Sequence, residues 1–308
     1  MTTSAPTSPD SGTPDARPVL LAIGGVDPTG RAGLAADIRA GEAAGVHVAP
    51  VPVALTAQNA DGVTHIEPAT PLLIHSQVRA VLEDLPVAAV KIGLMPSAQV
   101  VGAVVEALAL LPAQVPMIID PVMGASSGGR LVPAVSRSWC RQLRLLCRRA
   151  TLLTPNILEA SALLVGELPA GGRRIMRLQA RALRERYGCD VLLKGGHLPN
   201  GQSVIDVLAM KNSEETFISP RLPAPDLRGT GCTLATLIAA HMAHGQPLLN
   251  AVATARRRLL EGLSHIVPIG GRGAPPVRLP VSSDSPTPEE GASSASDNIV
   301  HLNKGDLE

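Results

Sequence analysis

The chain has 308 residues with 27 basic and 26 acidic side chains, a formal net charge of +1, and a single residue each of Trp, Tyr and Phe. This balance argues against a strongly basic surface for nucleic acid or for an anionic membrane, and so few aromatic residues make base-stacking platforms improbable. No apolar run reaches about 18 residues, so the sequence predicts neither a signal peptide nor a membrane span.

The two ends of the chain differ in composition from its middle. Residues 1–17 and 281–308 are rich in small polar residues and lack hydrophobic periodicity. We therefore expect a disordered leader and a disordered tail, with one folded domain over residues 18–280.

Within the expected domain, short apolar runs alternate with longer segments of helical periodicity. This alternation predicts an α/β fold of three layers, in which a mostly parallel central sheet has helices on both faces. The apolar runs predict strands at 19–25, 47–55, 88–94, 116–122, 150–156 and 190–196. The periodic segments predict helices at 31–45, 70–83, 97–110, 134–148, 173–187 and 231–244.

Polar residues stand at the ends of the predicted strands. In parallel sheets, ligands bind at the carboxyl ends of the strands, so these side chains are expected to surround one site. They are Asp27, Gln58, Lys91, Asp120, Asn156 and Lys194.

The first polar motif is the glycine-rich stretch GGVDPTGRAGLAAD, from Gly24 to Asp37. It matches neither the dinucleotide fingerprint nor the Walker A loop, so a flexible turn between strand and helix is one interpretation. The other is that Asp37 holds a hydroxyl or amino group of a ligand. Further along, the Gln58 amide suits the edge of a heterocycle, although glutamine after a strand is also a common turn residue.

Carboxylates and a lysine follow the later strands. Asp120 could hold Mg²⁺ through water or simply begin the turn that Pro121 continues. Asn156 and Glu159 have the spacing of a capping box, and their functional alternative is to order Mg²⁺ with its waters. Lys194, which precedes two glycines, could meet a phosphate.

The stretch DLRGTGCTLAT places one of four cysteines at the start of a predicted helix. Glycines there allow backbone N–H groups to converge, and the helix dipole adds partial positive charge, which together describe an anion hole. The same position gives Cys232 a reason for a lowered pKa. The alternative is a glycine-rich helix start with an inert cysteine. The four cysteines form no CxxC pair, which argues against a zinc site and indicates a reducing, cytoplasmic location.

Taken together and in this order, the motifs resemble the ribokinase-like superfamily, and most closely the hydroxymethylpyrimidine/phosphomethylpyrimidine kinases of thiamine biosynthesis. The matching stretches are GGVDPTGRAGLAAD, ALTAQNADGV, KIGLM, DPVM, LTPNILEA, LLKGGH, DVL at 206–208 and GTGCTLA. The resemblance implies transfer of phosphate from ATP, with Mg²⁺, to 4-amino-5-hydroxymethyl-2-methylpyrimidine and then to its monophosphate. It also implies a homodimer.

The resemblance assigns roles by motif position. Gly25, Asp37 and Gln58 are expected to contact the pyrimidine, with Leu94 and Val122 as apolar walls. Cys232 is expected beside the reacting hydroxyl, where related sugar kinases carry an aspartate base, and Gly229, Gly231 and the Cys232 backbone as the anion hole. Asn156 and Glu159 are expected to order Mg²⁺, and Asp120, Lys194 and Thr230 to line the phosphate and nucleotide region.

The sequence departs from the family pattern at several places, among them Val26 in place of a hydroxyl residue and a closing stretch reduced to GGRGAPPV. Arg31 replaces a glycine, Ser126 a lysine, and Arg228 a common histidine. Two alternatives stay open on this basis. One is a pyridoxal or pyridoxine kinase of the same superfamily, and the other is a non-catalytic homologue that binds a pyrimidine.

Overall fold

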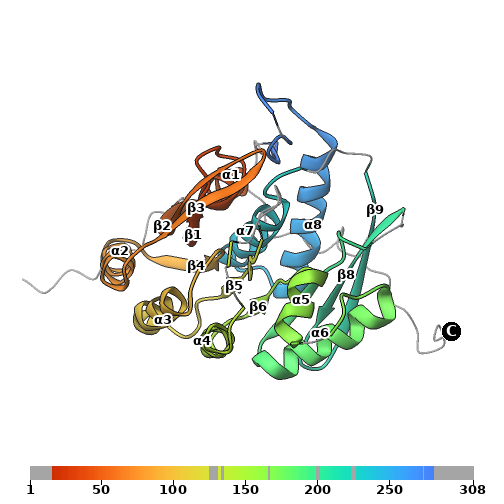
Figure 1. The fold of residues 1–308 in the computed structure, drawn as a ribbon, viewed down its shortest axis with the longest axis horizontal. Helices are drawn as coiled ribbons and strands as arrows, with labels where there is room; N and C mark the ends of the chain where they lie inside the picture. Colours follow the sequence, from red (N-terminus) through yellow and green to blue (C-terminus); the bar gives the residue numbers. More distant parts are fainter. Residues whose placement is uncertain are drawn as a thin grey trace, which may run out of the picture.

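A computed structural model describes residues 16–124, 131–132, 135–165, 167–198, 202–222, 227–272 and 274–280. Its centre is a nine-stranded sheet that lies between two layers of helices (Figure 1). Most of the expected leader and all of the expected tail lie outside the described residues, as does Ser126. Among the described residues, no helix is both long enough and apolar enough to cross a membrane.

The strands of the sheet are parallel in its middle and antiparallel toward its edges. Their bounds in chain order are β1 Val19–Val26, β2 His47–Asn59, β3 Gly62–Pro68, β4 Val87–Ile92, β5 Met117–Ile119, β6 Leu152–Leu153, β7 Asp190–Lys194, β8 Ser203–Ala209 and β9 Glu214–Pro220. The spatial order is β3-β2-β1-β4-β5-β6-β7-β8-β9. Strands β2, β1, β4, β5, β6 and β7 run parallel to one another, whereas β3 pairs antiparallel with β2, β8 with β7, and β9 with β8.

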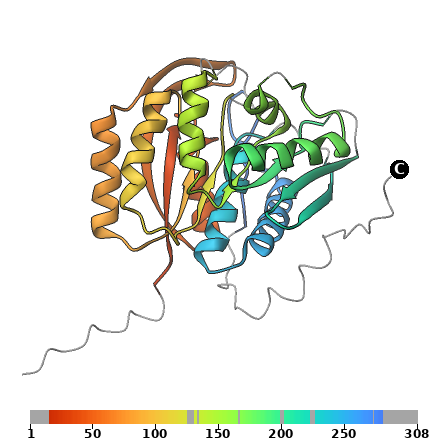
Figure 2. The ribbon, with the colours of Figure 1, turned by 90° about the horizontal axis from the view of Figure 1, so that it is seen from below.

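Helices cover both faces of the sheet. One face carries α1 Gly33–Ala43, α7 Thr230–Ala243 and α8 Leu248–Ser264. The opposite face carries α2 Pro71–Asp84, α3 Ala98–Ala107, α4 Arg137–Cys147, α5 Ile157–Leu164 and α6 Arg173–Tyr187, with a 3₁₀ turn at Leu108–Leu110. Figure 2 shows α2, α3 and α4, in orange to yellow-green, side by side on that face.

The two helix layers pack on separate hydrophobic cores because successive side chains of a strand point to opposite faces of the sheet. In β1, Leu21 and Ile23 belong to the core under α2 to α6, whereas Leu20 and Ala22 belong to the core under α1, α7 and α8. An apolar run buried on both sides is typical of a parallel sheet with helices on both faces. The predicted three-layer α/β/α class is therefore confirmed.

Several boundaries differ from the sequence prediction. The predicted strand 150–156 shortens to two residues because Pro155 and the capping of α5 at Asn156 end it. Strand β2 runs on to Asn59 and pairs with β3, which was not predicted because most of its residues are exposed. Strands β8 and β9 and helix α8 were also missed, since polar residues interrupt their apolar pattern.

Candidate active site

A pocket of about 1180 Å³ opens at the carboxyl ends of the parallel strands. Every residue for which the sequence predicts a role lines it. They are Gly25, Asp37, Gln58, Leu94, Asp120, Val122, Asn156, Glu159, Lys194, Gly229, Thr230, Gly231 and Cys232. The topology explains this convergence, because chain segments far apart in sequence end at the same edge of the sheet.

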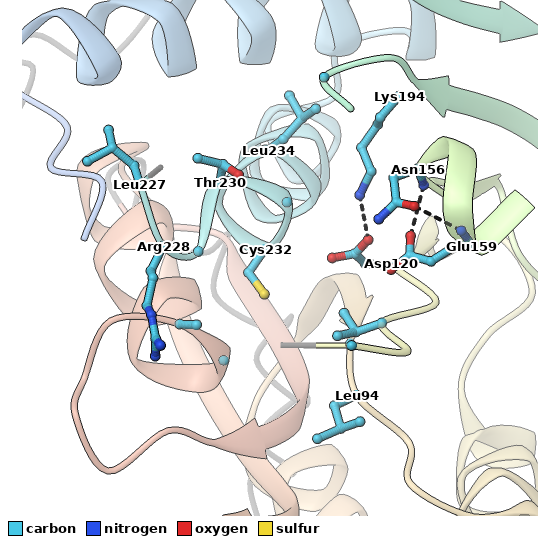
Figure 3. Close-up of a pocket in the computed structure, with 18 of the residues that line it drawn as sticks. Leu94, Asp120, Asn156, Glu159, Lys194, Leu227, Arg228, Thr230, Cys232 and Leu234 are labelled. Atoms are coloured by element: carbon cyan, nitrogen blue, oxygen red, sulfur yellow. Dashed lines mark hydrogen bonds and ion pairs between the residues drawn. The ribbon is translucent and has the colours of Figure 1, made fainter. Parts of the chain in front are cut away.

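The start of α7 forms one wall of the pocket (Figure 3). The helix begins at Thr230, and Gly229 precedes it with a left-handed φ of 79°. The backbone N–H groups of Thr230, Gly231 and Cys232 belong to the first turn, where no preceding helical carbonyl is available to accept them. They are therefore donors for an anion, and the helix dipole adds to their partial positive charge.

The surroundings require glycine at position 229 and leave little free space at Gly231. A Cβ at Gly229 would lie 2.5 Å from the backbone oxygen of Arg31. A Cβ at Gly231 would lie 3.3 Å from Lys194 Nζ and 3.5 Å from Asp120 Oδ2. The bare backbone of Gly231 thus faces the charged groups across the pocket.

We expect Gly229→Ala to lower the free energy of unfolding by about 1–3 kcal/mol, because alanine resists a left-handed φ and its Cβ would collide with Arg31. Anion binding at the start of α7 should also weaken, since the first turn of the helix must shift. Gly188→Ala is the matched control. Gly188 has a φ of 78° at the end of α6, but a Cβ there would meet nothing within 4 Å. Chemical denaturation of both variants measures the difference, and an equal loss in both would contradict the steric argument.

Cys232 is the third residue of α7, and its side chain points into the pocket (Figure 3). Burial raises the pKa of the thiol to about 11, although Lys91 opposes the shift and Asp37 and Asp120 add to it. The expectation of a lowered pKa is therefore wrong. Desolvation of the thiolate and repulsion from the nearby carboxylates outweigh the attraction of Lys91. In the unliganded protein at neutral pH, Cys232 is a thiol.

Asp37 and Lys91 form a buried ion pair behind Cys232. Lys91 Nζ lies 2.8 Å and 2.9 Å from the two carboxylate oxygens, and both side chains are 1% exposed. Thr236 Oγ1 also donates to Asp37, at 2.8 Å. Burial acts to lower the pKa of Lys91, but Asp37, Cys232 and Asp120 overcome this and raise it. Lys91 is the penultimate residue of β4, which agrees with its predicted place at a strand end.

A second charged pair faces the start of α7. Lys194 Nζ lies 2.8 Å from Asp120 Oδ1. Thr154 Oγ1 donates to the same oxygen at 3.3 Å. The pair comes from the ends of β5 and β7, which lie on either side of β6 in the sheet. A lysine held in this way offers a positive charge to a phosphate at the helix start.

Asn156 and Glu159 form the capping box that the sequence predicted as one alternative. Asn156 Oδ1 accepts from the backbone N–H groups of Leu158 and Glu159 at 2.9 Å, and Glu159 Oε2 accepts from the Asn156 N–H at 2.8 Å. Glu159 also faces Asp120 and Lys194. Burial raises its pKa to about 7, with Lys194 opposing the shift and Asp120 adding to it. Capping and a role in the pocket are therefore compatible.

The remaining predicted residues form a less polar end of the pocket. Gly25 lies against Leu94, because a Cβ there would come within 2.8 Å of Leu94 Cδ2. Val122 packs at the edge of the core. Gln58 lies in the outer part of β2, not after the strand as predicted, and it is half-buried.

The carboxylates suit a hard cation that a substrate phosphate helps to hold. Among the residues described, no three His, Cys, Asp or Glu side chains are grouped to bind a metal ion by themselves. Mg²⁺ commonly takes one or two carboxylates and completes its shell with waters and phosphate oxygens. Asp120 and Glu159 fit that requirement.

Sequence reasoning missed the far end of the pocket, where Asp206 and Arg256 lie. Arg256 Nε is 2.8 Å from Asp206 Oδ2, and its guanidinium lies 5.0 Å from the centre of the Phe217 ring. Arg256 belongs to a run of three arginines in a helix that was not predicted, and such a run is typical of a solvent-exposed helix face. The motif match at 206–208 is the signal that could have identified Asp206 as a pocket residue.

Comparisons with known proteins identify relatives that cover nearly the whole described chain. The family model "Phosphomethylpyrimidine kinase" matches residues 27–278. A hydroxymethylpyrimidine/phosphomethylpyrimidine kinase of Mycobacterium tuberculosis is 37% identical over 273 residues, which are 88% of this chain and 96% of that protein. The chain spans about half the length of some other relatives, such as a bifunctional thiamine biosynthesis protein of Geobacter sulfurreducens, of which it covers 52%.

Solved structures agree with these relatives. A phosphomethylpyrimidine kinase from Clostridium difficile is 31% identical, has a TM-score of 0.66, and is matched over 80% of this chain and 99% of its own. A pyridoxal kinase of Bacillus subtilis, solved as an ADP complex, has a TM-score of 0.74 at 24% identity over 84% of this chain and 96% of its own, which shows the shared fold. The family match and the extent of identity lead to one conclusion: the chain belongs to the phosphomethylpyrimidine kinase family.

Proposed function

We propose that the protein transfers phosphate from ATP to 4-amino-5-hydroxymethyl-2-methylpyrimidine, and then to its monophosphate, in thiamine biosynthesis. One observation carries the proposal. The glycine-rich start of α7 faces the Lys194–Asp120 pair in a pocket that Gly25, Gln58 and Leu94 also line. Such a pocket has a place for transferred phosphate beside a place for a small heterocycle.

The residues divide between positioning and charge stabilisation. The Gln58 amide offers both a donor and an acceptor to the pyrimidine edge, and Leu94 and Val122 enclose its apolar atoms. The first N–H groups of α7 and Lys194 stabilise the negative charge that spreads over the phosphoryl oxygens in transfer. Cys232 lies next to these donors, where the acceptor hydroxyl must approach the phosphorus. Thr230 and the Asp206–Arg256 end of the pocket are then left for the nucleotide.

The Asp37 carboxylate is not free to bind the substrate with all of its hydrogen-bonding capacity. Both of its oxygens already accept hydrogen bonds from Lys91, and one also accepts from Thr236. Its contact with the pyrimidine would therefore use a carboxylate that is already held in place. This arrangement fixes the orientation of the group before the substrate arrives.

Mg²⁺ is proposed to be held by Asp120 and Glu159 together with nucleotide phosphates, and it would supply further neutralisation of phosphate charge. Asn156 acts here through its cap on α5, which orients Glu159. The expected homodimer and cytoplasmic location belong to the same proposal, as does the assignment of residues 18–280 to a single catalytic domain.

The direct experiment measures ADP formation by the purified protein with ATP, Mg²⁺ and each acceptor in turn. We expect turnover with hydroxymethylpyrimidine and with its monophosphate. Pyridoxal in the same assay distinguishes the alternative superfamily activity. A protein that is folded by circular dichroism, binds the pyrimidine in calorimetry and turns over neither pyrimidine would instead be a non-catalytic homologue.

The raised pKa of Glu159 makes the proposed Mg²⁺ site sensitive to pH. Below about pH 7 the carboxyl is protonated and neutral, so it attracts the cation less. We expect the half-saturating Mg²⁺ concentration to rise by up to about tenfold between pH 8 and pH 6, as the ionised fraction of such a group falls. Steady-state kinetics at fixed ATP measure this change.

Glu159→Gln should weaken Mg²⁺ at pH 8 and remove most of the pH dependence, while the amide oxygen can still accept the Asn156 N–H. Glu83→Gln, at an exposed position of α2, is the matched control. A glutamine variant that keeps the pH dependence of the parent protein would show that another group controls it.

A further inference from the structure

The β2–β3 hairpin contributes Thr56 and Gln58 to the lining of the pocket. In Figure 1 its tip lies beside the segment that follows α8. The two are joined by Arg272, whose guanidinium nitrogens lie 3.2 Å and 2.9 Å from the Asp61 carboxylate oxygens. At its base, Thr56 Oγ1 donates to the Val26 backbone oxygen at 2.9 Å. Gln58 lies between these two attachments.

A third attachment is made by Arg228, which immediately precedes Gly229. Its Nη2 donates to the backbone oxygen of Asn59 at 2.7 Å, and its backbone N–H donates to the Pro275 oxygen at 3.2 Å. Arg228 is 5% exposed and lines the pocket. One residue therefore connects the start of α7, the hairpin and the segment after α8.

The direction of Arg228 distinguishes it from the residues around the phosphate. In Figure 3 its guanidinium points away from the Lys194–Asp120 pair, with Cys232 between them. It is thus aimed at the hairpin that carries the heterocycle contact, not at the far side of the pocket where phosphate charge is stabilised.

The charges around Arg228 indicate that its hydrogen bond to the hairpin is the contact that holds its side chain. Burial lowers the pKa of Arg228, Asp27 opposes this, and the neighbouring Arg31 adds to it. The Asp27 carboxylate is already used by the Thr29 backbone and hydroxyl and by the Ala32 N–H. Among the described residues, Arg228 makes no ion pair within 4 Å, and its side-chain partner is the Asn59 carbonyl. A buried guanidinium without a paired carboxylate is costly, so this bond must hold it in place.

We propose that Arg228 is a positioning residue for the acceptor substrate. It holds the β2–β3 hairpin against the start of α7, and it thereby sets the position of Gln58 relative to Cys232. A heterocycle that binds between these two side chains meets a preformed site, whereas a detached hairpin would have to close on each binding event. Only the expected change in KM rests on the proposed pyrimidine substrate; the hairpin contact itself does not.

The test compares Arg228→Met, Arg228→Lys and Arg272→Gln with the parent protein. In Arg228→Met we expect the KM for hydroxymethylpyrimidine to rise about tenfold, the effect of losing one hydrogen bond from a charged group, with kcat and the KM for ATP within about twofold of the parent. Amide hydrogen exchange over residues 59–66 should become faster, while α6 keeps its protection. Arg228→Lys should recover part of both effects.

Arg272→Gln is the matched control, because it removes a contact from the same hairpin but at side chains that are 79% and 61% exposed. We expect it to change neither KM by more than about twofold. Unchanged exchange over residues 59–66 in Arg228→Met would overturn the proposal. So would a KM increase for the monophosphate alone, which would make Arg228 a phosphate ligand.

Hydrogen exchange and calorimetric titration with the pyrimidine need no turnover. If the parent protein phosphorylates neither pyrimidine, the proposed function fails, while faster exchange in Arg228→Met still supports the hairpin contact.

Discussion

Replacing Cys232 with alanine is expected to lower kcat about a hundredfold, the low end of the effect of removing a group that takes part in proton transfer. The thiol lies at the start of α7, next to the N–H groups proposed to stabilise the transferred phosphate. Alanine is a good helix former of smaller volume, so the fold should persist. Steady-state kinetics with the pyrimidine, together with circular dichroism, check both parts of this expectation.

The raised pKa of Cys232 adds a pH dependence to this prediction. If the thiolate accepts the hydroxyl proton, only the deprotonated fraction is active, and that fraction rises about tenfold per pH unit below a pKa of about 11. We therefore expect kcat/KM of the parent protein to rise between pH 7 and pH 9, and the small residual activity of Cys232→Ala not to follow it. A flat parent profile would show that the thiol orients the hydroxyl without taking its proton.

Cys140→Ala is the matched control, because Cys140 is half-buried on α4, on the opposite face of the sheet. It should leave kcat near that of the parent protein. Equal losses in the two alanine variants would mean that Cys232 contributes only to packing.

Replacing Lys91 with methionine is expected to lower the free energy of unfolding by about 3–5 kcal/mol, the range for breaking a buried ion pair by removing one partner. Methionine fills the volume of the lysine stem but leaves Asp37 charged inside the core. Activity should fall as well, because Asp37 loses the partner that orients it. Urea denaturation at pH 7 measures the loss of stability.

The sign of the pH effect in this variant follows from the remaining carboxylate. Burial already raises the pKa of Asp37 above its usual value in the intact protein, and loss of Lys91 removes the main opposing influence. The unfavourable charge is present above the folded-state pKa and disappears as pH falls below it, so the difference from the parent protein should shrink at acidic pH.

A double variant separates charge from packing. Lys91→Met combined with Asp37→Asn removes both charges at similar volume, and it should be more stable than Lys91→Met alone. Arg257→Met, which removes an exposed partner of Glu261 on α8, should leave stability nearly unchanged. If the double variant is no more stable than the single one, the loss comes from packing rather than from an unpaired charge.

Local sequence patterns were sufficient where structure depends on neighbours along the chain. The helix predicted at 173–187 has those bounds, because its arginine-rich and apolar faces repeat with helical period and Gly188 ends it in a left-handed conformation. The capping box at Asn156 and Glu159 was also visible, since it depends on a spacing of three residues. The edge strands were not, because β3 is largely exposed and strands at an edge need no continuous apolar run.

The sequence by itself determined the fold class and the set of polar and glycine residues that gather at one pocket, because alternating apolar periods impose a covered parallel sheet whose strand ends converge. Only the tertiary structure decided the pairing, protonation and direction of those side chains. Lys91 pairs with Asp37 across 54 positions of the chain, burial keeps Cys232 a thiol, and Arg228 turns toward Asn59. Each outcome depends on desolvation and on charges contributed by distant segments, and neither quantity exists until the chain has packed.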